Sequence, residues 1–373
     1  MLIAWFCGEW WLRWGSPRVL TYSIVGLVLG PGLHWIDPVA IPQGRYITDF
    51  AMGLALFEIG FRLNPVWLAR NRWVIVTSVG ESIATYVAVL GCGIAANLSL
   101  LQSSILASLC VATSPISVLR VTRDAQSSGQ VTNLILTMSA LNSLAAILLF
   151  KGSVGIGLHS TSDNNIPLRG AVLFIVLSSI GLAILAAMAF AVVRKWIVMP
   201  QDSVAFTIAL YVGCVTFAAD WARLSPALAT IVLGIAFRAL DIKITGKYQD
   251  FGSFGRFGTI FLYLYVSAGI SFLAAWQGLY LGLFVVLVRA ATKIGMCTFM
   301  SKPLGATTRK GFLAGLGLMP VSVFGLIVLE QANQLGMPRF GIFPQFASIA
   351  LCLEILGPLA TSLAIRWSGE HLD

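Results

Sequence analysis

The chain has 373 residues, of which 58% are hydrophobic and only 10% are charged, and its mean hydropathy is +0.87. Soluble domains carry about 25% charged residues, so this composition excludes a water-soluble fold. The apolar residues fall in stretches of roughly 18 to 27, long enough to cross a bilayer as helix, without the alternation of a membrane barrel. The net charge of +9 is therefore no sign of a nucleic-acid partner.

We predict an all-α polytopic membrane protein with about thirteen transmembrane helices, because only helices and closed barrels satisfy their backbone groups in lipid. The expected spans are residues 1–14, 18–36, 47–62, 73–98, 103–120, 130–150, 168–193, 203–220, 224–238, 256–274, 278–300, 311–331 and 343–366.

Lys and Arg residues gather on one side of this arrangement. Seventeen of the 24 fall on one set of alternate connections and five on the other, while Arg289 and Lys293 lie inside a span. Cytoplasmic loops carry the excess of positive charge, so we expect the N-terminus outside and the C-terminus in the cytoplasm, in the plasma (cytoplasmic) membrane. The six cysteines are scattered singly and the three histidines form no ligand pattern, so we expect neither a metal nor a cofactor.

Two spans contain a proline near the middle. The fifth reads SILASLCVATSPISVLRV with Pro115, and the twelfth reads GFLAGLGLMPVSVFGLIVLE with Pro320. Proline removes one helical hydrogen bond, and interrupted helices in corresponding positions of two inverted repeats often mark a transporter's binding site. Spans seven apart have opposite orientations, which fits two inverted repeats around the seventh span. The alternative is that both prolines are ordinary kinks in membrane helices.

Four further segments carry a family likeness: GLVLGPGLHWI (26–36), GLALFEIGFRLN (53–64), SPALATIVLGIAFR (225–238) and EILGPLATSLAIRWSGE (354–370). In this order and spacing they resemble the monovalent cation:proton antiporter superfamily, with its sodium/hydrogen exchanger-like and Kef-like membrane domains. The four segments run through nearly the whole chain.

The resemblance implies a single transmembrane exchanger-like domain over residues 1–373, in which two interrupted helices cross. A mobile core would hold the helices near 47–150 and 256–331, and dimerisation helices would lie near 1–36 and 168–238. The implied function is secondary antiport of a monovalent cation, Na⁺ or K⁺, against protons by a homodimer in the lipid bilayer. An enzyme is not expected.

The family's ion site combines an Ala-Thr-Asp-Pro motif in the fifth span with an Asn-Asp or Asp-Asp pair in the sixth. A carboxylate there makes a proton and a cation compete for one site. Here the motif is Ala112-Thr113-Ser114-Pro115, and the sixth span has Asn142-Ser143. The resemblance therefore assigns ion binding to Thr113, Ser114, Asn142 and Ser143, whose neutral oxygens can coordinate a cation but cannot exchange a proton for it.

Three charged residues inside spans are candidates for the missing ionisable group, because charges at membrane depth are costly and often functional. Glu81 lies in the fourth span, and Arg289 and Lys293 lie in the eleventh, where the family often has a functional Lys or Arg. Glu81 and Lys293 would form a buried pair that is coupled to transport. The alternative is that all three stabilise helix packing or extend toward the interface.

Two other functions remain open at this level. The loss of both carboxylates fits a transport-inactive relative that serves as a membrane sensor or scaffold. A site with Arg289 and Lys293 but no sixth-span carboxylate fits a carrier of anions or organic acids.

Overall fold

The structure is a computed structural model, and it describes residues 1–12, 16–35, 44–161, 168–196, 204–242, 252–270, 272–321 and 343–371. These residues form helices and short connections, and none of the described segments is a β-strand. The helices are α1 (Leu2–Leu12), α2 (Arg18–Leu27), the π-helix η1 (Val28–Gly32), α3 (Gly44–Arg62), α4 (Pro65–Arg70), α5 (Arg72–Ala95), α6 (Leu100–Val111), α7 (Pro115–Asp124), α8 (Gln130–Thr161), α9 (Leu168–Trp196), α10 (Val204–Trp221), α11 (Pro226–Ala239), α12 (Gly252–Ala268), α13 (Phe272–Gln277), α14 (Leu279–Phe299), α15 (Thr308–Gly317) and α17 (Phe343–Ser368).

The all-helical class is confirmed. Six described helices are long and apolar enough to cross a membrane, and they comprise Arg72–Ala95, Gln130–Val154, Leu173–Trp196, Val204–Trp221, Leu279–Phe299 and Gln345–Ser368. Three shorter apolar helices accompany them: Arg18–Gly32, Leu100–Val111 and Pro226–Ala239. Each of the thirteen predicted stretches overlaps a described helix. The number of crossings and the inverted repeats stay predictions.

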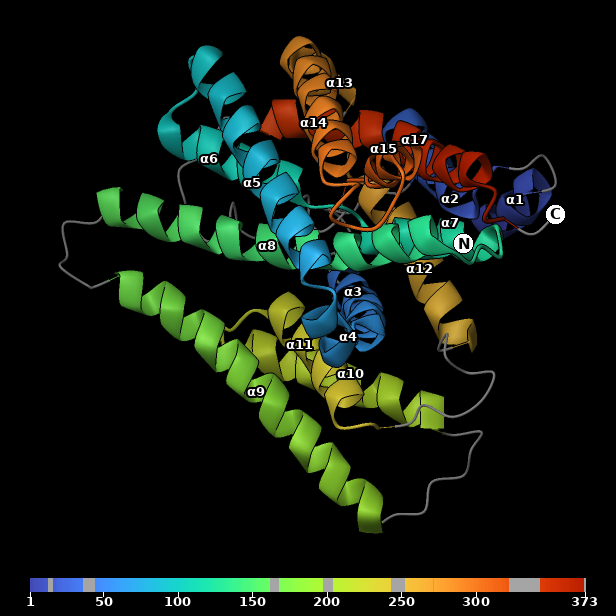
Figure 1. Cartoon of the computed structure of the whole chain (residues 1–373), viewed down its shortest axis with the longest axis vertical. Helices are drawn as coiled ribbons and strands as arrows, with labels where there is room; N and C mark the ends of the chain where they lie inside the picture. Colours follow the sequence, from blue (N-terminus) through green and yellow to red (C-terminus); the bar gives the residue numbers. More distant parts are fainter. Residues whose placement is uncertain are drawn as a thin grey trace. The chain divides into compact units, whose positions relative to one another are not determined.

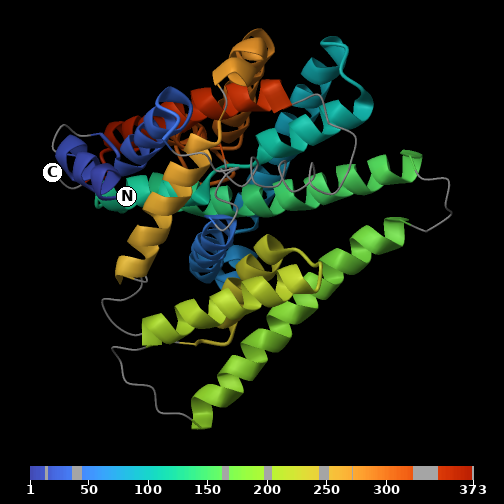
Figure 2. The same ribbon diagram turned by 180° about the vertical axis from the view of Figure 1, so that it is seen from behind.

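The chain forms two compact units. Unit 1 comprises residues Met1–Pro42, Arg72–Val154 and Tyr263–Asp373, and unit 2 comprises Gln43–Asn71 and Gly155–Leu262. Within unit 1, α5 packs against α6 and α14, while α17 packs against α2, α7, α14 and α15 (Figures 1 and 2). The division into a core and a dimerisation domain stays a prediction.

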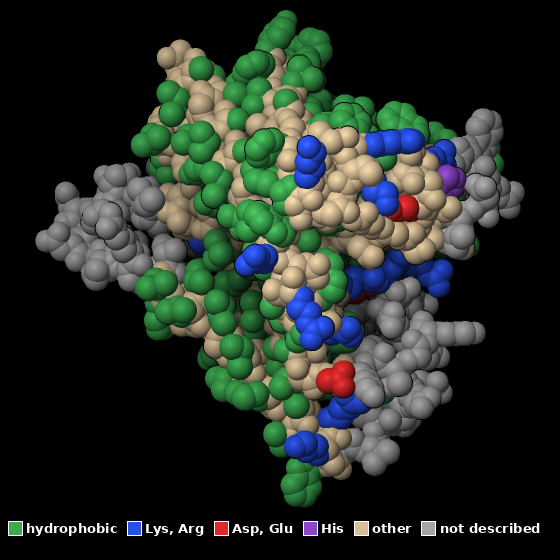
Figure 3. Space-filling model, viewed as in Figure 1, with side chains coloured by type: hydrophobic (Ala, Val, Ile, Leu, Met, Phe, Trp, Pro, Cys, Tyr) green, Lys and Arg blue, Asp and Glu red, His purple; other side chains and the backbone are tan. Residues whose placement is uncertain are grey.

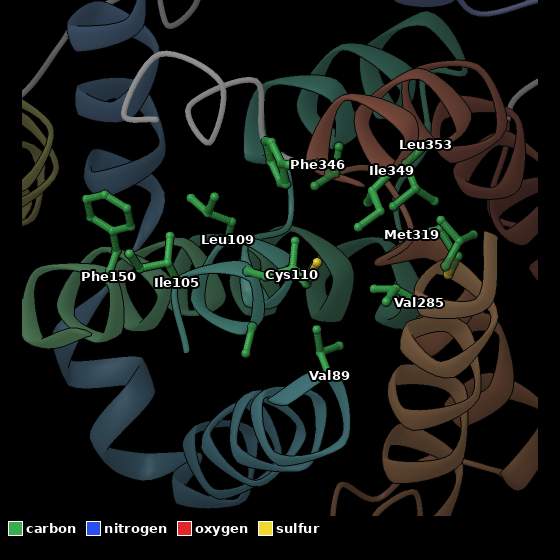
Figure 4. Packing of buried hydrophobic residues seen from close by; sticks show 14 residues of the cluster. Val89, Ile105, Leu109, Cys110, Phe150, Val285, Met319, Phe346, Ile349 and Leu353 are labelled. Atoms are coloured by element: carbon green, nitrogen blue, oxygen red, sulfur yellow. The ribbon is translucent and has the colours of Figure 1, made fainter. Parts of the chain in front are cut away.

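The core of unit 1 surrounds the C-terminal half of α6 (Figure 4). Ile105, Leu109 and Cys110 of α6 lie in one buried cluster with Val285 of α14, Met319, and side chains of α17. This cluster holds the end of α6 beside the end of α15, which is the part of unit 1 where the polar residues described below lie.

In unit 2, α11 packs closely on α3. Gly60 of α3 lies against the backbone of Ile231, and Gly234 of α11 lies against the backbone of Phe57, so a side chain at either glycine would separate the helices. Phe57 and Phe237 stack edge to face beside this contact, with ring centroids 5.2 Å apart. Small residues allow such close backbone contact in membrane helices.

Apolar side chains cover much of the face of the molecule that Figure 3 shows. On α5, for example, Val76, Val79, Ile83 and Val87 are exposed, whereas the opposite side of the helix is buried and carries polar residues. Apolar side chains that face outward while polar ones face inward are the arrangement expected of helices in lipid.

Candidate ion-binding site

The first interrupted helix lies where Pro115 predicts it. Helix α6 ends at Val111, three residues follow outside helical conformation, and α7 begins at Pro115. Proline suits the first position of a helix because its missing N–H has no intrahelical acceptor there. Ser114 precedes it as the N-cap, and its hydroxyl accepts a hydrogen bond from the backbone N–H of Ser117 at 3.3 Å.

The end of α15 and the non-helical residues up to Val321 meet this interruption. Helix α15 ends at Gly317, and the chain around Pro320 is not helical. The backbone N–H of Ser114 donates to the carbonyl of Pro320 at 2.9 Å, and Thr113 and Val321 form an antiparallel bridge. Residues 322–342, which include the rest of the twelfth predicted span, lie outside the described residues. The two non-helical segments therefore satisfy part of each other's backbone hydrogen bonding.

Arg289 of α14 holds the two helix ends together. Its side chain is fully buried, and Nε donates to the carbonyl of Cys110 at 2.8 Å while Nη1 donates to that of Met319 at 2.6 Å. Nη2 donates to the carbonyl of Ala112 at 3.0 Å. The last carbonyls of a helix have no intrahelical donors and carry a partial negative charge. The guanidinium supplies both the donors and the opposite charge to α6 and α15 at once.

Lys293, one turn after Arg289 on α14, forms an ion pair with Glu81 of α5, and both side chains are 0% exposed. The ammonium also donates to Thr113 Oγ1 at 3.2 Å and to the carbonyl of Val111 at 3.3 Å. The pair thus touches the interruption of the first helix directly. Thr85 donates to the same carboxylate oxygen, Oε1, at 3.0 Å.

Asn142 of α8 completes the other side of Glu81. Its amide Nδ2 donates to Glu81 Oε2 and, at 3.4 Å, to Thr113 Oγ1. Its Oδ1 accepts hydrogen bonds from Ser78 at 2.7 Å and from Ser82 at 3.3 Å. These four contacts fix the orientation of the amide, which lies fully buried where α8 passes α5.

Ser143 belongs to this centre, whereas the side chain of Ser114 faces another neighbour. The hydroxyl of Ser143 donates to the carbonyl of Thr113 at 2.7 Å, so it lies against the interruption. The hydroxyl of Ser114 instead pairs with Tyr263 of α12 at 3.1 Å. Of the residues predicted to bind the ion, Thr113, Asn142 and Ser143 are in mutual contact, and Ser114 is directed to a different neighbour.

Helix α17 packs against the end of α15 and Pro320. Gly357 lies against the backbone of Pro320, and Thr361 donates to the carbonyl of Gly317 at 2.9 Å. Just after this helix, Glu370 accepts hydrogen bonds from the backbone N–H groups of Val131 and Thr132 at 2.9 and 2.8 Å. Glu370 thereby caps the first turn of α8, the helix that carries Asn142.

Sequence analysis missed several residues that support this site. Ser78, Ser82 and Thr85 share a face of α5 with Glu81, at the three- and four-residue spacing that places side chains in one stripe. That stripe of polar residues in an apolar span was the signal for them. Tyr263, in contrast, lies on a span with no comparable pattern.

The arrangement offers hydroxyl, amide and carboxylate oxygens around one buried ion pair. Within the described residues, no three His, Cys, Asp or Glu side chains are placed to hold a metal ion. A monovalent cation needs fewer charged ligands, and the carboxylate of Glu81 with the hydroxyl of Thr113 is the start of such a donor set, whereas the oxygen of Asn142 faces Ser78 and Ser82.

Comparison with known proteins gives a family and a fold. The family model described as "Sodium/hydrogen exchanger, transmembrane" matches residues 2–367. The chain resembles two structures of the sodium proton antiporter MjNhaP1 from Methanocaldococcus jannaschii. The one at pH 8 has a TM-score of 0.69 and 16% identity, and the electron-microscopy map has a TM-score of 0.77 and 15% identity. Each comparison covers 99% of this chain and 94% of the other. A search of curated protein sequences gives no match.

Proposed function

Because the chain belongs to the sodium/hydrogen exchanger family, whose members are multi-pass membrane transporters and not enzymes, we propose that it exchanges a monovalent cation for protons. We further propose that the pair of Glu81 and Lys293 takes the role of the carboxylate that relatives carry at the position of Ser143. The observation that carries it is the contact of Lys293 with both Glu81 and Thr113 at the interrupted helix.

The pair supports exchange by competition for one carboxylate. In the described state, the Glu81 carboxylate neutralises the Lys293 ammonium. A cation that binds Glu81 and Thr113 takes over that carboxylate. An ammonium at low dielectric without a counter-charge is costly, so Lys293 gives up its proton. Cation binding thus releases one proton, and proton return expels the cation.

The test is cation-driven proton flux in proteoliposomes across a range of pH, with Na⁺, K⁺ and a large organic cation compared. Proton movement that depends on Na⁺ or K⁺ supports exchange. Flux that depends on the anion and not on the cation favours the anion or organic-acid carrier. The positive charges of Arg289 and Lys293 support that alternative. Absence of any flux favours the sensor or scaffold.

We further propose about thirteen spans in two inverted repeats, a homodimer, and a mobile core that carries the interrupted helices.

The charge distribution supports an N-terminus outside and a cytoplasmic C-terminus in the plasma membrane. A Ser160→Cys variant in intact cells is expected to react with a membrane-impermeant thiol reagent added outside. Reaction only from the cytoplasmic side would reverse the orientation.

Ser143→Asp is expected to introduce a second, strongly pH-dependent cation site. The native hydroxyl donates to the carbonyl of Thr113, whereas a carboxylate at this position would face that carbonyl oxygen to oxygen. A proton or a cation must then lie between them. We expect cation-driven proton flux to rise several-fold and its pH dependence to steepen. Ser143→Asn, which adds bulk without charge, is the control, and equal behaviour of the two variants would contradict this account.

A further inference from the structure

Glu354 of α17 is a buried carboxylate that the proposed exchange does not use. It is 4% exposed, and its Oε1 accepts hydrogen bonds from Ser23 of α2 at 2.8 Å and Ser267 of α12 at 3.5 Å. No Lys or Arg among the described residues forms an ion pair with it. The two other deeply buried glutamates of the described chain differ in this respect, since Glu81 pairs with Lys293 and Glu58 pairs with Arg62.

An ionised carboxylate in this setting would be costly. Two neutral hydroxyls do not offset the loss of hydration of a full charge at low dielectric, and an isolated buried carboxylate therefore takes up a proton. When both hydroxyls donate to Oε1, Oε2 carries that proton; when Ser23 donates to the carbonyl of Val19 at 3.2 Å instead, its oxygen can accept the proton from Oε1. Glu354 is thus suited to be a neutral acid that donates and receives a proton without a fixed counter-charge.

The other titratable groups near Glu354 do not neutralise it. On α12, the phenol of Tyr263 is hydrogen-bonded to Ser114, and Arg120 of α7 lies near the same phenol. Arg18 at the start of α2 is paired with Glu9 and Asp124. On α14, Arg289 donates to helix-end carbonyls and Lys293 pairs with Glu81. Arg18, Arg289 and Lys293 therefore have partners other than Glu354.

Helix α12 connects Glu354 with the interrupted helix. Ser267, which donates to Glu354, and Tyr263, which pairs with Ser114, are four residues apart and lie on one face of α12. Ser114 in turn caps α7 and bonds to Pro320 through its backbone. A change in the charge of Glu354 alters the strength of its hydrogen bond with Ser267. One turn of α12 transmits this change to Tyr263, which contacts Ser114 at the interrupted helix.

We propose that Glu354, with Ser23 and Ser267, is a second proton-binding site of unit 1 that sets the pH range of exchange at the interrupted helices. The proposal rests on the proposed function for its effect on transport, but proton binding itself does not require transport. When Glu354 loses its proton, its hydrogen bond with Ser267 becomes stronger. Ser267 then pulls the turn of α12 that also carries Tyr263 toward α17. The contact of Tyr263 with Ser114 then changes with the occupancy of the acid.

Infrared difference spectroscopy of the full-length protein in membranes tests proton binding. Between acidic and alkaline pH, the native protein is expected to gain and lose the carbonyl stretch of a buried carboxylic acid, and Glu354→Gln is expected to lack this band. Glu58→Gln is the matched control, because Glu58 is equally buried but paired, and it should keep the band. Ser23→Ala with Ser267→Ala should keep the band and move it to higher frequency, since Oε1 then lacks its donors.

Flux measurements test the link to transport. In Glu354→Gln, the pH at half-maximal cation-driven proton flux is expected to move by about one unit, a tenfold change in proton concentration, with the maximal rate retained. A band that persists in Glu354→Gln would overturn the proton site. Loss of the band with an unchanged pH profile would overturn the link through α12. If the native protein shows no flux, the proposed function fails, while the infrared result still decides whether Glu354 binds a proton.

Discussion

Glu81→Gln is expected to abolish cation-driven proton flux and to lower the free energy of unfolding by about 3–5 kcal/mol, because it leaves the Lys293 ammonium buried without a counter-charge. Lys293→Met is expected to have a similar effect on stability, since it leaves the carboxylate alone. The double variant Glu81→Gln, Lys293→Met should regain most of the lost stability but none of the flux. Thermal unfolding in detergent and flux in proteoliposomes measure the two quantities.

This double-mutant cycle separates packing from transport. If the pair only stabilises helix packing, the double variant recovers both stability and flux, and the proposed exchange by Glu81 and Lys293 is wrong. Glu58→Gln is the control, since its partner Arg62 is partly exposed and lies 3.5 Å away. We expect that variant to lose about 1 kcal/mol or less, because the partly exposed Arg62 can regain hydration when its partner is removed.

Arg289→Met is expected to destabilise unit 1 by about 3–5 kcal/mol and to separate the ends of α6 and α15. The substitution leaves the carbonyls of Cys110, Ala112 and Met319 without their donor, and each buried unsatisfied group costs about 1–3 kcal/mol. Hydrogen exchange should speed up at the backbone N–H of Ser114, whose acceptor is the carbonyl of Pro320. Thermal unfolding and exchange measured by mass spectrometry report the two effects.

Arg289→Lys distinguishes charge from geometry. A lysine keeps the positive charge but has no planar fork to reach two helix ends, so it should recover only part of the lost stability. Arg309→Met is the matched control in the same unit, because Arg309 is exposed and donates to the carbonyl of Trp367. Native-like stability of Arg289→Lys would show that charge alone holds the ends together.

The general architecture was accessible from the sequence because it depends on local properties. Apolar stretches of membrane length require helices, whatever their neighbours are. A proline in a long apolar span prevents one helical hydrogen bond, so the end of α6 before Pro115 follows from one residue. Which segment meets that end does not follow, because the partners Thr113 and Val321 are far apart in the chain and meet only in the folded unit.

The candidate site was accessible only in part. Glu81 and Lys293 were detectable because a charge in an apolar span is rare, but their contact with Thr113 depends on how α5, α14 and α6 pack. The bonds of Arg289 were beyond sequence analysis for another reason. Its acceptors are backbone carbonyls, which every residue has, so no pattern of side chains in the sequence predicts them.

The cap of α8 by Glu370 shows the same limit. The closing motif that contains Glu370 resembles the family's, but its role appears only when the residue lies beside Val131 and Thr132. Gly129 lies directly against this carboxylate, so a side chain there would displace it. A capping residue next in sequence to its helix can be recognised, whereas one from a distant segment cannot.

The convergence of two helix ends on Arg289 has a consequence for the electrical balance of the cycle. Arg289 and Lys293 bring two positive charges and Glu81 one negative, while the C-terminal ends of α6 and α15 each add about half a negative charge. The N-terminus of α7 adds about half a positive charge, so the described site carries about half a positive charge in total. When a cation enters and Lys293 loses its proton at the same time, the net charge of the site does not change. A one-for-one exchange at this site moves no net charge, so the membrane potential neither drives nor opposes it.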